Sequence, residues 1–161
     1  MRAALFWLGL ALCLAVPGGL IAQKERLLQT GRVVLLPLAP VDPRSLMQGD
    51  YMDLRYRLAD EVFEASERGE AWPERSVVVV RLDADGVAAF ARLDRGEALA
   101  PDEQRLRYYP RRGLPRFGAE SYLFEEGRAD YYAVGRYGEL RVAEDGTALL
   151  AGLRDSDRNP L

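Results

Sequence analysis

The chain divides into an apolar first segment and a longer part in which short apolar runs alternate with charged turns. Residues 3–22 carry no charge. A helix of twenty residues is about 30 Å long, which matches the hydrocarbon core of a bilayer. The pattern therefore predicts an N-terminal transmembrane helix, which the polar residues 23–32 can continue until Gly31 ends it.

Two interpretations of this first segment stay open. In one, residues 1–26 form an uncleaved anchor, and Arg2 favours a cytoplasmic N-terminus by the positive-inside rule. In the other, Pro17-Gly18-Gly19 ends the apolar helix of a signal peptide that is removed after Ala22. Both interpretations place the rest of the chain outside the cytoplasm.

Residues 31–155 have the pattern of a β domain. After Gly49, apolar residues alternate with charged ones from position 52 to position 58, which is the period of a half-buried strand. Other strand-like runs occur at 33–38, 77–82, 105–109, 121–124 and 139–142. A short helix is predicted at 125–133, and residues 59–70 fit either a short helix or a loop. The order predicts a mainly β fold, namely a small antiparallel β sandwich or barrel-like domain with one or two short helices. A polar tail follows at 156–161.

Two segments of this domain resemble each other. Residues 84–93, ADGVAAFARL, align without a gap with residues 144–153, EDGTALLAGL. Asp-Gly between two apolar runs is a strong hairpin signal, and in a two-residue turn both of its residues take positive φ. The alignment predicts two similar β-hairpins.

Composition excludes several kinds of chemistry. The 161 residues include no histidine, and the single cysteine, Cys13, lies in the apolar segment. Ser-His-Asp triads, Cys-His pairs, histidine-ligated metal sites and internal disulfides are therefore impossible. Basic residues number 22 against 25 acidic ones and form no basic stripe, so we expect no nucleic-acid partner. No cofactor or metal site is predicted, because the Asp-Gly turns lack the further ligands of a calcium loop.

Two short motifs carry a resemblance to a known family. The stretch GDYMDLRY resembles the motif of the bacterial GDYxxLxY family, whose fixed positions are Gly49, Asp50, Tyr51, Leu54 and Tyr56. A second block, residues 121–127, is similar to a Tyr-Phe-aliphatic-x-Glu-Gly segment of that family, with Leu and Phe in exchanged order; its matching residues are Tyr122, Glu126 and Gly127. The resemblance implies a membrane-anchored N-terminus, one small domain, and a multi-pass membrane protein as a partner.

We therefore expect a single-pass protein of the bacterial inner membrane, held in the membrane through residues 3–22, with its C-terminal domain in the periplasm. Its expected role is protein–protein interaction, or that of an accessory module for a membrane protein. The eight motif residues are expected to serve structure or binding, and none is predicted to be catalytic.

The alternative is a membrane-tethered hydrolase. Two carboxylates about 5 to 9 Å apart would suffice for acid/base work, and the candidates are Asp50, Asp53, Glu125 and Glu126. In the structural interpretation, Asp53 instead pairs with an arginine across strands. The run from Pro43 to Asp50 also resembles the approach to a strand in signal-peptidase-like β domains. Their serine–lysine dyad is missing, since Lys24 beside the apolar segment is the only lysine, so at most that scaffold is shared.

Overall fold

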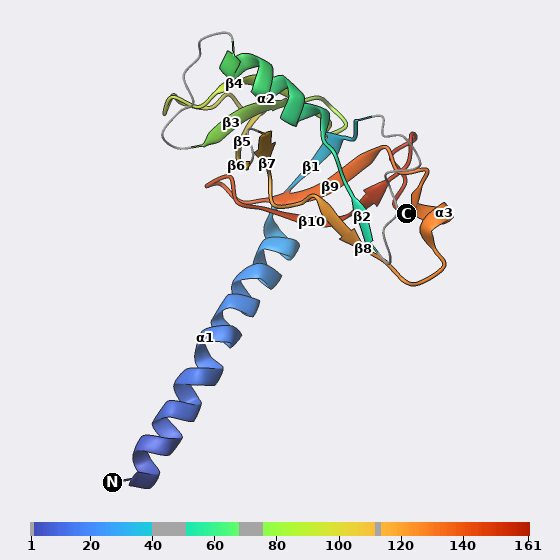
Figure 1. Cartoon of the computed structure of the whole chain (residues 1–161). Coiled ribbons are helices and arrows are strands. Elements are labelled where there is room, and N and C mark those ends of the chain that lie inside the picture. Colours follow the sequence, from blue (N-terminus) through green and yellow to red (C-terminus); the bar gives the residue numbers. More distant parts are fainter. Residues whose placement is uncertain (1, 40–50, 68–75, 112–113) are drawn as a thin grey trace.

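The computed structural model describes residues 2–39, 51–67, 76–111 and 114–161 and consists of a long helix joined to a β-rich domain (Figure 1). Helix α1 (Arg2–Thr30) extends away from the domain. It ends at Gly31 as predicted, and the amide of Gly31 donates to the carbonyl of Leu27 at 2.8 Å. Within the described residues no helix is long and apolar enough to cross a membrane, so the transmembrane span predicted for residues 3–22 has no support here.

The domain is built from short antiparallel sheets, which confirms the prediction of a mainly antiparallel β fold with a few short helices. The two three-stranded sheets have the orders β1-β9-β10 and β4-β3-β5, and the two-stranded sheets are β2-β8 and β6-β7. The strands are β1 (Arg32–Pro37), β2 (Tyr51–Asp53), β3 (Val77–Leu82), β4 (Ala88–Leu93), β5 (Glu103–Arg107), β6 (Tyr109–Arg111), β7 (Leu114–Arg116), β8 (Ser121–Leu123), β9 (Tyr137–Val142) and β10 (Ala148–Arg154). The short helices are α2 (Arg57–Glu67) and α3 (Ala129–Tyr132).

The core lies between the two three-stranded sheets and α2. Strand β3 is a nearly continuous apolar run, VVVVRL, and it is the central strand of its sheet, buried on both faces. Helix α2 resolves the segment that fitted either a helix or a loop. It buries Leu58, Val62 and Ala65, which lie on one face at helical spacing, and packs against β4 and β7. The turn predicted for residues 43–47, together with Gly49 and Asp50, lies outside the described residues.

The two Asp-Gly segments form the predicted hairpins, β3-β4 and β9-β10, but with a different turn. Only the glycines, Gly86 and Gly146, have positive φ, at 80° and 87°. In the first turn the amide of Asp83 donates to the carbonyl of Val87, and the carbonyl of Asp83 accepts from Gly86. Ala143 bonds to Thr147 and Gly146 in the same way in the second turn. This is a three-residue turn ending in a glycine bulge, so the expectation of positive φ at both central residues was wrong.

The likeness of the hairpins extends beyond their turns. Ala91 and Ala151 occupy the same aligned position, and each is the extra residue where the pairing register shifts. In both sheets a third strand pairs with the first strand of the hairpin, β5 with β3 and β1 with β9. The carbonyl of Gly86 accepts from Leu35 of β1, and that of Gly146 accepts from Arg107 of β5, both at 2.9 Å. Each hairpin turn is thus bonded to the third strand of the opposite sheet.

The C-terminal tail folds back onto the domain. Residues 156–160 are exposed, yet Pro160 forms a bridge with Arg154. The amide of Leu161 donates to the carbonyl of Leu153 at 3.0 Å, and the Leu161 side chain packs against the core. The last residues are therefore tied to β10.

Gly138 of β9 lies directly against the ring of Tyr56. A Cβ at position 138 would lie 2.8 Å from Cε1 of Tyr56 and 2.9 Å from its hydroxyl oxygen. Tyr56 is fully buried and its ring cannot move aside. We therefore expect Gly138→Ala to lower the free energy of unfolding by about 1–3 kcal/mol through overpacking, measured by urea denaturation.

Gly152→Ala is the matched control for this substitution. Gly152 lies on the partner strand β10, and a Cβ there would have nothing within 4 Å. We expect its effect to stay within about 0.5 kcal/mol. Equal losses from both variants would contradict the assigned contact with Tyr56.

Candidate functional site

The described part of the first motif block contributes the short strand β2 and the buried residues Leu54 and Tyr56 to the core. Met52, Leu54, Tyr56 and Leu58 are buried, whereas the charged residues between them are exposed, which confirms the predicted two faces. Strand β2 pairs with β8, and Leu54 continues this pairing by donating its amide to the carbonyl of Glu120 at 2.6 Å. The side chain of Tyr51 lies outside the described residues. The motif thus supports the domain from within.

Tyr56 fastens this strand to the segment before β8. Its hydroxyl donates to the carbonyl of Ala119 at 2.5 Å, and its ring meets Phe117 edge to face with centroids 6.1 Å apart. Burial raises the pKa of Tyr56 far above its usual value, and the charge of Glu120 adds to this. The phenol is therefore a neutral hydrogen-bond donor with a structural role.

A small cavity of about 190 Å³ opens beside the motif strand. Leu54, Tyr56 and Pro115 contribute to its lining, together with two ion pairs near the surface. Arg55 Nη2 lies 2.8 Å from Asp60 Oδ1, and Arg116 Nη1 lies 3.6 Å from Asp53 Oδ1. Asp53 does pair with an arginine, as its structural interpretation predicted.

The second motif block leads into an aromatic cluster, which we define as Tyr122, Phe124, Tyr131 and Tyr132. Tyr132 is its centre, with ring centroids 5.1 Å from Tyr122, 5.3 Å from Phe124 and 5.0 Å from Tyr131. Three of the rings pack partly against the core, whereas Tyr131 is 46% exposed. The cluster is therefore firmly held and reaches the surface at Tyr131.

The charged residue Arg128 contacts the aromatic cluster. The guanidinium carbon of Arg128 lies 4.6 Å from the ring centroid of Tyr131, within the range of a cation–π contact. Arg128 also pairs with Glu125 at 3.6 Å, while Glu126 and Asp130 are exposed. Gly127 has a φ of 81° in the turn that precedes α3, which explains why this position needs glycine.

These positions do not assemble an acid/base pair among the described residues. Asp53 is paired with Arg116 and Glu125 with Arg128. Asp50 lies outside the described residues. The parts of the chain that the structure describes contain no group of three or more Cys, Asp or Glu side chains placed to hold a metal ion.

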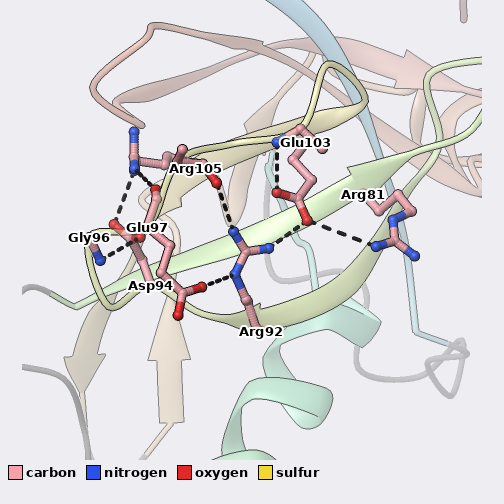
Figure 2. A network of polar contacts seen from close by, with 9 residues as sticks. Arg81, Arg92, Asp94, Gly96, Glu97, Glu103 and Arg105 are labelled. Atoms are coloured by element: carbon pink, nitrogen blue, oxygen red, sulfur yellow. Dashed lines mark hydrogen bonds and ion pairs between the residues drawn. The ribbon is translucent and has the colours of Figure 1, made fainter.

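Sequence reasoning missed a network of arginines and carboxylates on the β4-β3-β5 sheet (Figure 2). Arg92 lies between Glu97 and Glu103, with its guanidinium nitrogens 2.9 Å and 2.5 Å from their carboxylate oxygens. Arg105 binds Asp94 at 3.0 Å. Strand alternation could have placed Arg92 and Arg105 on a surface, but only the pairing of both with Val79 makes them neighbours.

The carboxylates of this network are already engaged. Glu103 accepts from Arg92 through one oxygen and from the amide of Ala100 through the other. Asp94 likewise accepts from Arg105 and from the amide of Gly96. The hydrogen bond from Arg92, followed by that from the Ala100 amide, lowers the pKa of Glu103. Because both carboxylates are buried with their oxygens bound, the network serves structure.

An open hollow of about 740 Å³ lies next to this network. Its charged lining includes Arg105, bound to Asp94, and Arg107, which lies 3.1 Å from Asp145. These pairs neutralise one another across the hollow. None of these four charged groups is therefore left unpaired to attract a ligand.

Glu103→Gln tests the network through its pH dependence. A carboxylate whose pKa is lowered by folding stabilises the fold above its ordinary pKa of about 4.3, and this contribution disappears as the pH falls through the lowered value. We expect thermal denaturation of Glu103→Gln to show a reduced midpoint near neutral pH, with the difference from the wild type shrinking below about pH 4.

Glu97→Gln provides the control, because it removes the exposed partner of the same arginine. Exposed ion pairs contribute little to stability, so its midpoint should stay close to that of the wild type. A loss from Glu103→Gln that does not change with pH would refute the electrostatic account.

Comparison with known proteins gives one match. The family described as GDYXXLXY protein matches residues 13–153, a range that contains both motif blocks and both hairpins. No curated protein and no solved structure matches the chain. Since the matched range covers well over half of the sequence, the chain belongs to the GDYXXLXY protein family.

Proposed function

We propose that this protein is a membrane-anchored docking module of the bacterial inner membrane, whose periplasmic domain binds a multi-pass membrane protein. The observation that carries the proposal is the aromatic cluster, which is fixed in the core and exposed at Tyr131 beside a family motif. Two of the carboxylates weighed for a hydrolase, Asp53 and Glu125, are bound to arginines, and Glu126 is exposed at the surface.

The first support for the anchor is the surface of α1. Large apolar side chains such as Trp7, Leu14 and Ile21 are each at least 65% exposed on this helix. Helix α1 points away from the β domain, so the domain does not cover them (Figure 1). Exposed apolar area is unfavourable in water and is normally buried against lipid or protein. The uncharged run 3–22 and the preceding Arg2 favour a membrane with the domain on its outer side.

The docking surface is supported by the kinds of residue it contains. Tyrosine and arginine are enriched among residues that dominate binding energy at interfaces. Tyr131 is held by Tyr132 and Arg128, so little side-chain freedom would be lost on binding. Three carboxylates, Glu125, Glu126 and Asp130, lie within three residues of Arg128 in the sequence, and Glu125 pairs with it. The partner that fits is a periplasmic loop presenting an apolar side chain next to a basic one.

Anchorage also favours such a partner on kinetic and energetic grounds. A tethered domain searches a small volume above the bilayer, which raises the effective concentration of any binding site in the same membrane. A loop of a multi-pass protein lies within that volume. The modest size of the aromatic cluster is therefore compatible with productive binding.

Cys13 allows a direct test of the anchor. It is the only cysteine, and a chain cleaved after Ala22 would lack it. We expect that the chain remains in carbonate-washed membranes and that a maleimide reagent labels it after denaturation. Leu14→Arg should move much of the chain to the supernatant, since an arginine at the centre of a membrane helix costs about 2.5–3.5 kcal/mol. A membrane-free chain without a thiol would instead establish a cleaved signal peptide.

Crosslinking at the aromatic cluster tests the docking role. A photoreactive residue in place of Tyr131 should give an adduct with one multi-pass membrane protein in intact cells, identified by mass spectrometry. Tyr109 is the matched control, because it is a 60% exposed tyrosine outside the cluster, on β6. We expect at least a fivefold weaker adduct from position 109. Val134 is 51% exposed and lies two residues after the cluster's Tyr132, so we expect a similar loss at position 131 when Val134→Glu is added. Equal adducts from both positions, or none from position 131, would reject the proposal.

A further inference from the structure

A groove of about 750 Å³ lies where α1 meets the β9-β10 hairpin. The last two turns of α1 form one wall, and the turn at residues 143–147 contributes to the other. The geometry of the joint is fixed by Arg32, whose guanidinium donates to the carbonyls of Glu103 and Pro101 at 3.0 Å and 3.2 Å. A Cβ at Gly31 would lie 2.6 Å from the carbonyl oxygen of Leu27, so this position has no room for a side chain. The groove is therefore a defined feature of the joint.

The groove is lined by Arg26 and Glu144, whose charged groups have no ion-pair partner among the described residues, and by Arg32, whose guanidinium is occupied by two backbone carbonyls. Arg26 lines it from α1 and Glu144 from the hairpin turn. The neighbouring Asp145 differs, because Thr147 and Arg107 bind its carboxylate. The bond from the Thr147 amide is the main reason why the pKa of Asp145 is lowered. The site thus offers one available guanidinium and one available carboxylate.

This pair of charges selects the class of ligand. A simple anion would be attracted by Arg26 but repelled by Glu144. A simple cation would be attracted by Glu144 but repelled by Arg26. A zwitterion that carries a phosphate and a primary ammonium has one group for each of these two charges. Arginine suits phosphate because its guanidinium can donate two parallel hydrogen bonds. A primary ammonium can donate hydrogen bonds to Glu144, whereas a quaternary ammonium cannot.

The depth of the groove fits a lipid headgroup, an argument that rests on the proposed membrane anchorage. If residues 3–22 fill the hydrocarbon core, Arg26 lies four residues beyond it, or about 6 Å along the helix. The headgroup layer on each side of a bilayer is about 5–7 Å thick. We infer that the α1/β9-β10 groove binds a phosphoethanolamine headgroup, with Arg26 on the phosphate and Glu144 on the ammonium.

The test uses the full chain in vesicles of equal parts phosphatidylethanolamine and phosphatidylcholine. After mild extraction, mass spectrometry of the lipids that copurify should show phosphatidylethanolamine enriched at least threefold over the vesicle composition. Arg26→Gln and Glu144→Gln should each return the ratio to that of the vesicle. Lys24→Gln and Glu126→Gln should keep the enrichment, because each removes a similar charge outside the groove. Loss of enrichment in Lys24→Gln as well would overturn the inference in favour of general surface charge.

A second arm distinguishes lipid from a soluble ligand. Phosphoethanolamine, phosphocholine and inorganic phosphate are titrated separately into the detergent-solubilised chain and followed by calorimetry. Binding of phosphoethanolamine that Glu144→Gln abolishes, without lipid enrichment, would support the groove with a soluble zwitterion as its ligand. No enrichment together with no phosphoethanolamine binding would overturn it. Vesicle flotation of each variant tests anchorage separately, so a chain that fails to float refutes the proposed anchor while the soluble arm still tests the groove.

Discussion

Two backbone hydrogen bonds join the halves of this domain and set the positions of its other parts. The carbonyls of Gly86 and Gly146, each in a turn that only glycine readily adopts, accept from Leu35 and Arg107 at the same distance of 2.9 Å. Each hairpin thereby reaches across to the sheet of the other. Because the bonds are reciprocal, the apolar faces of the two sheets are brought together around one core, on which α2 and the motif strand then pack.

Arginine complements this arrangement where the core ends. All basic residues except Lys24 are arginine, and several bind carboxylates on the outer surface of the β4-β3-β5 sheet (Figure 2). Asp94 and Glu103 can be buried there because an arginine donates to one oxygen of each and a backbone amide donates to the other. A buried carboxylate left without such donors would be strongly unfavourable. The carboxylate oxygens of Asp94 and Glu103 are thus all engaged in holding the 94–105 segment. Arg26 and Glu144 differ, because neither forms an ion pair with another described residue.

The sequence predicted those features whose physical signal is local. The alternation from Met52 to Leu58 predicted correctly which side chains are buried, but the strand itself covers only Tyr51–Asp53, and Leu58 already lies in helix α2. The Asp-Gly pairs predicted hairpins but not their turn, because the same pair suits two loop lengths and the flanking pairing decides between them. The arginine network and the aromatic cluster depend on strand partners and on where the Gly127 turn directs α3. The sequence contains the residues of both but does not encode their meeting in any local pattern.

The joint between α1 and β1 connects the proposed anchor to the proposed docking surface. A flexible linker would let the domain rotate freely above the membrane, and the aromatic cluster would then meet a partner loop at random angles. Here a single residue, Gly31, separates helix from strand, and Arg32 fastens the first residue of that strand to the second sheet. In the proposed arrangement the domain keeps one orientation relative to α1. A headgroup bound between Arg26 and Glu144 would strengthen this restraint, because it would contact the helix and the hairpin at once.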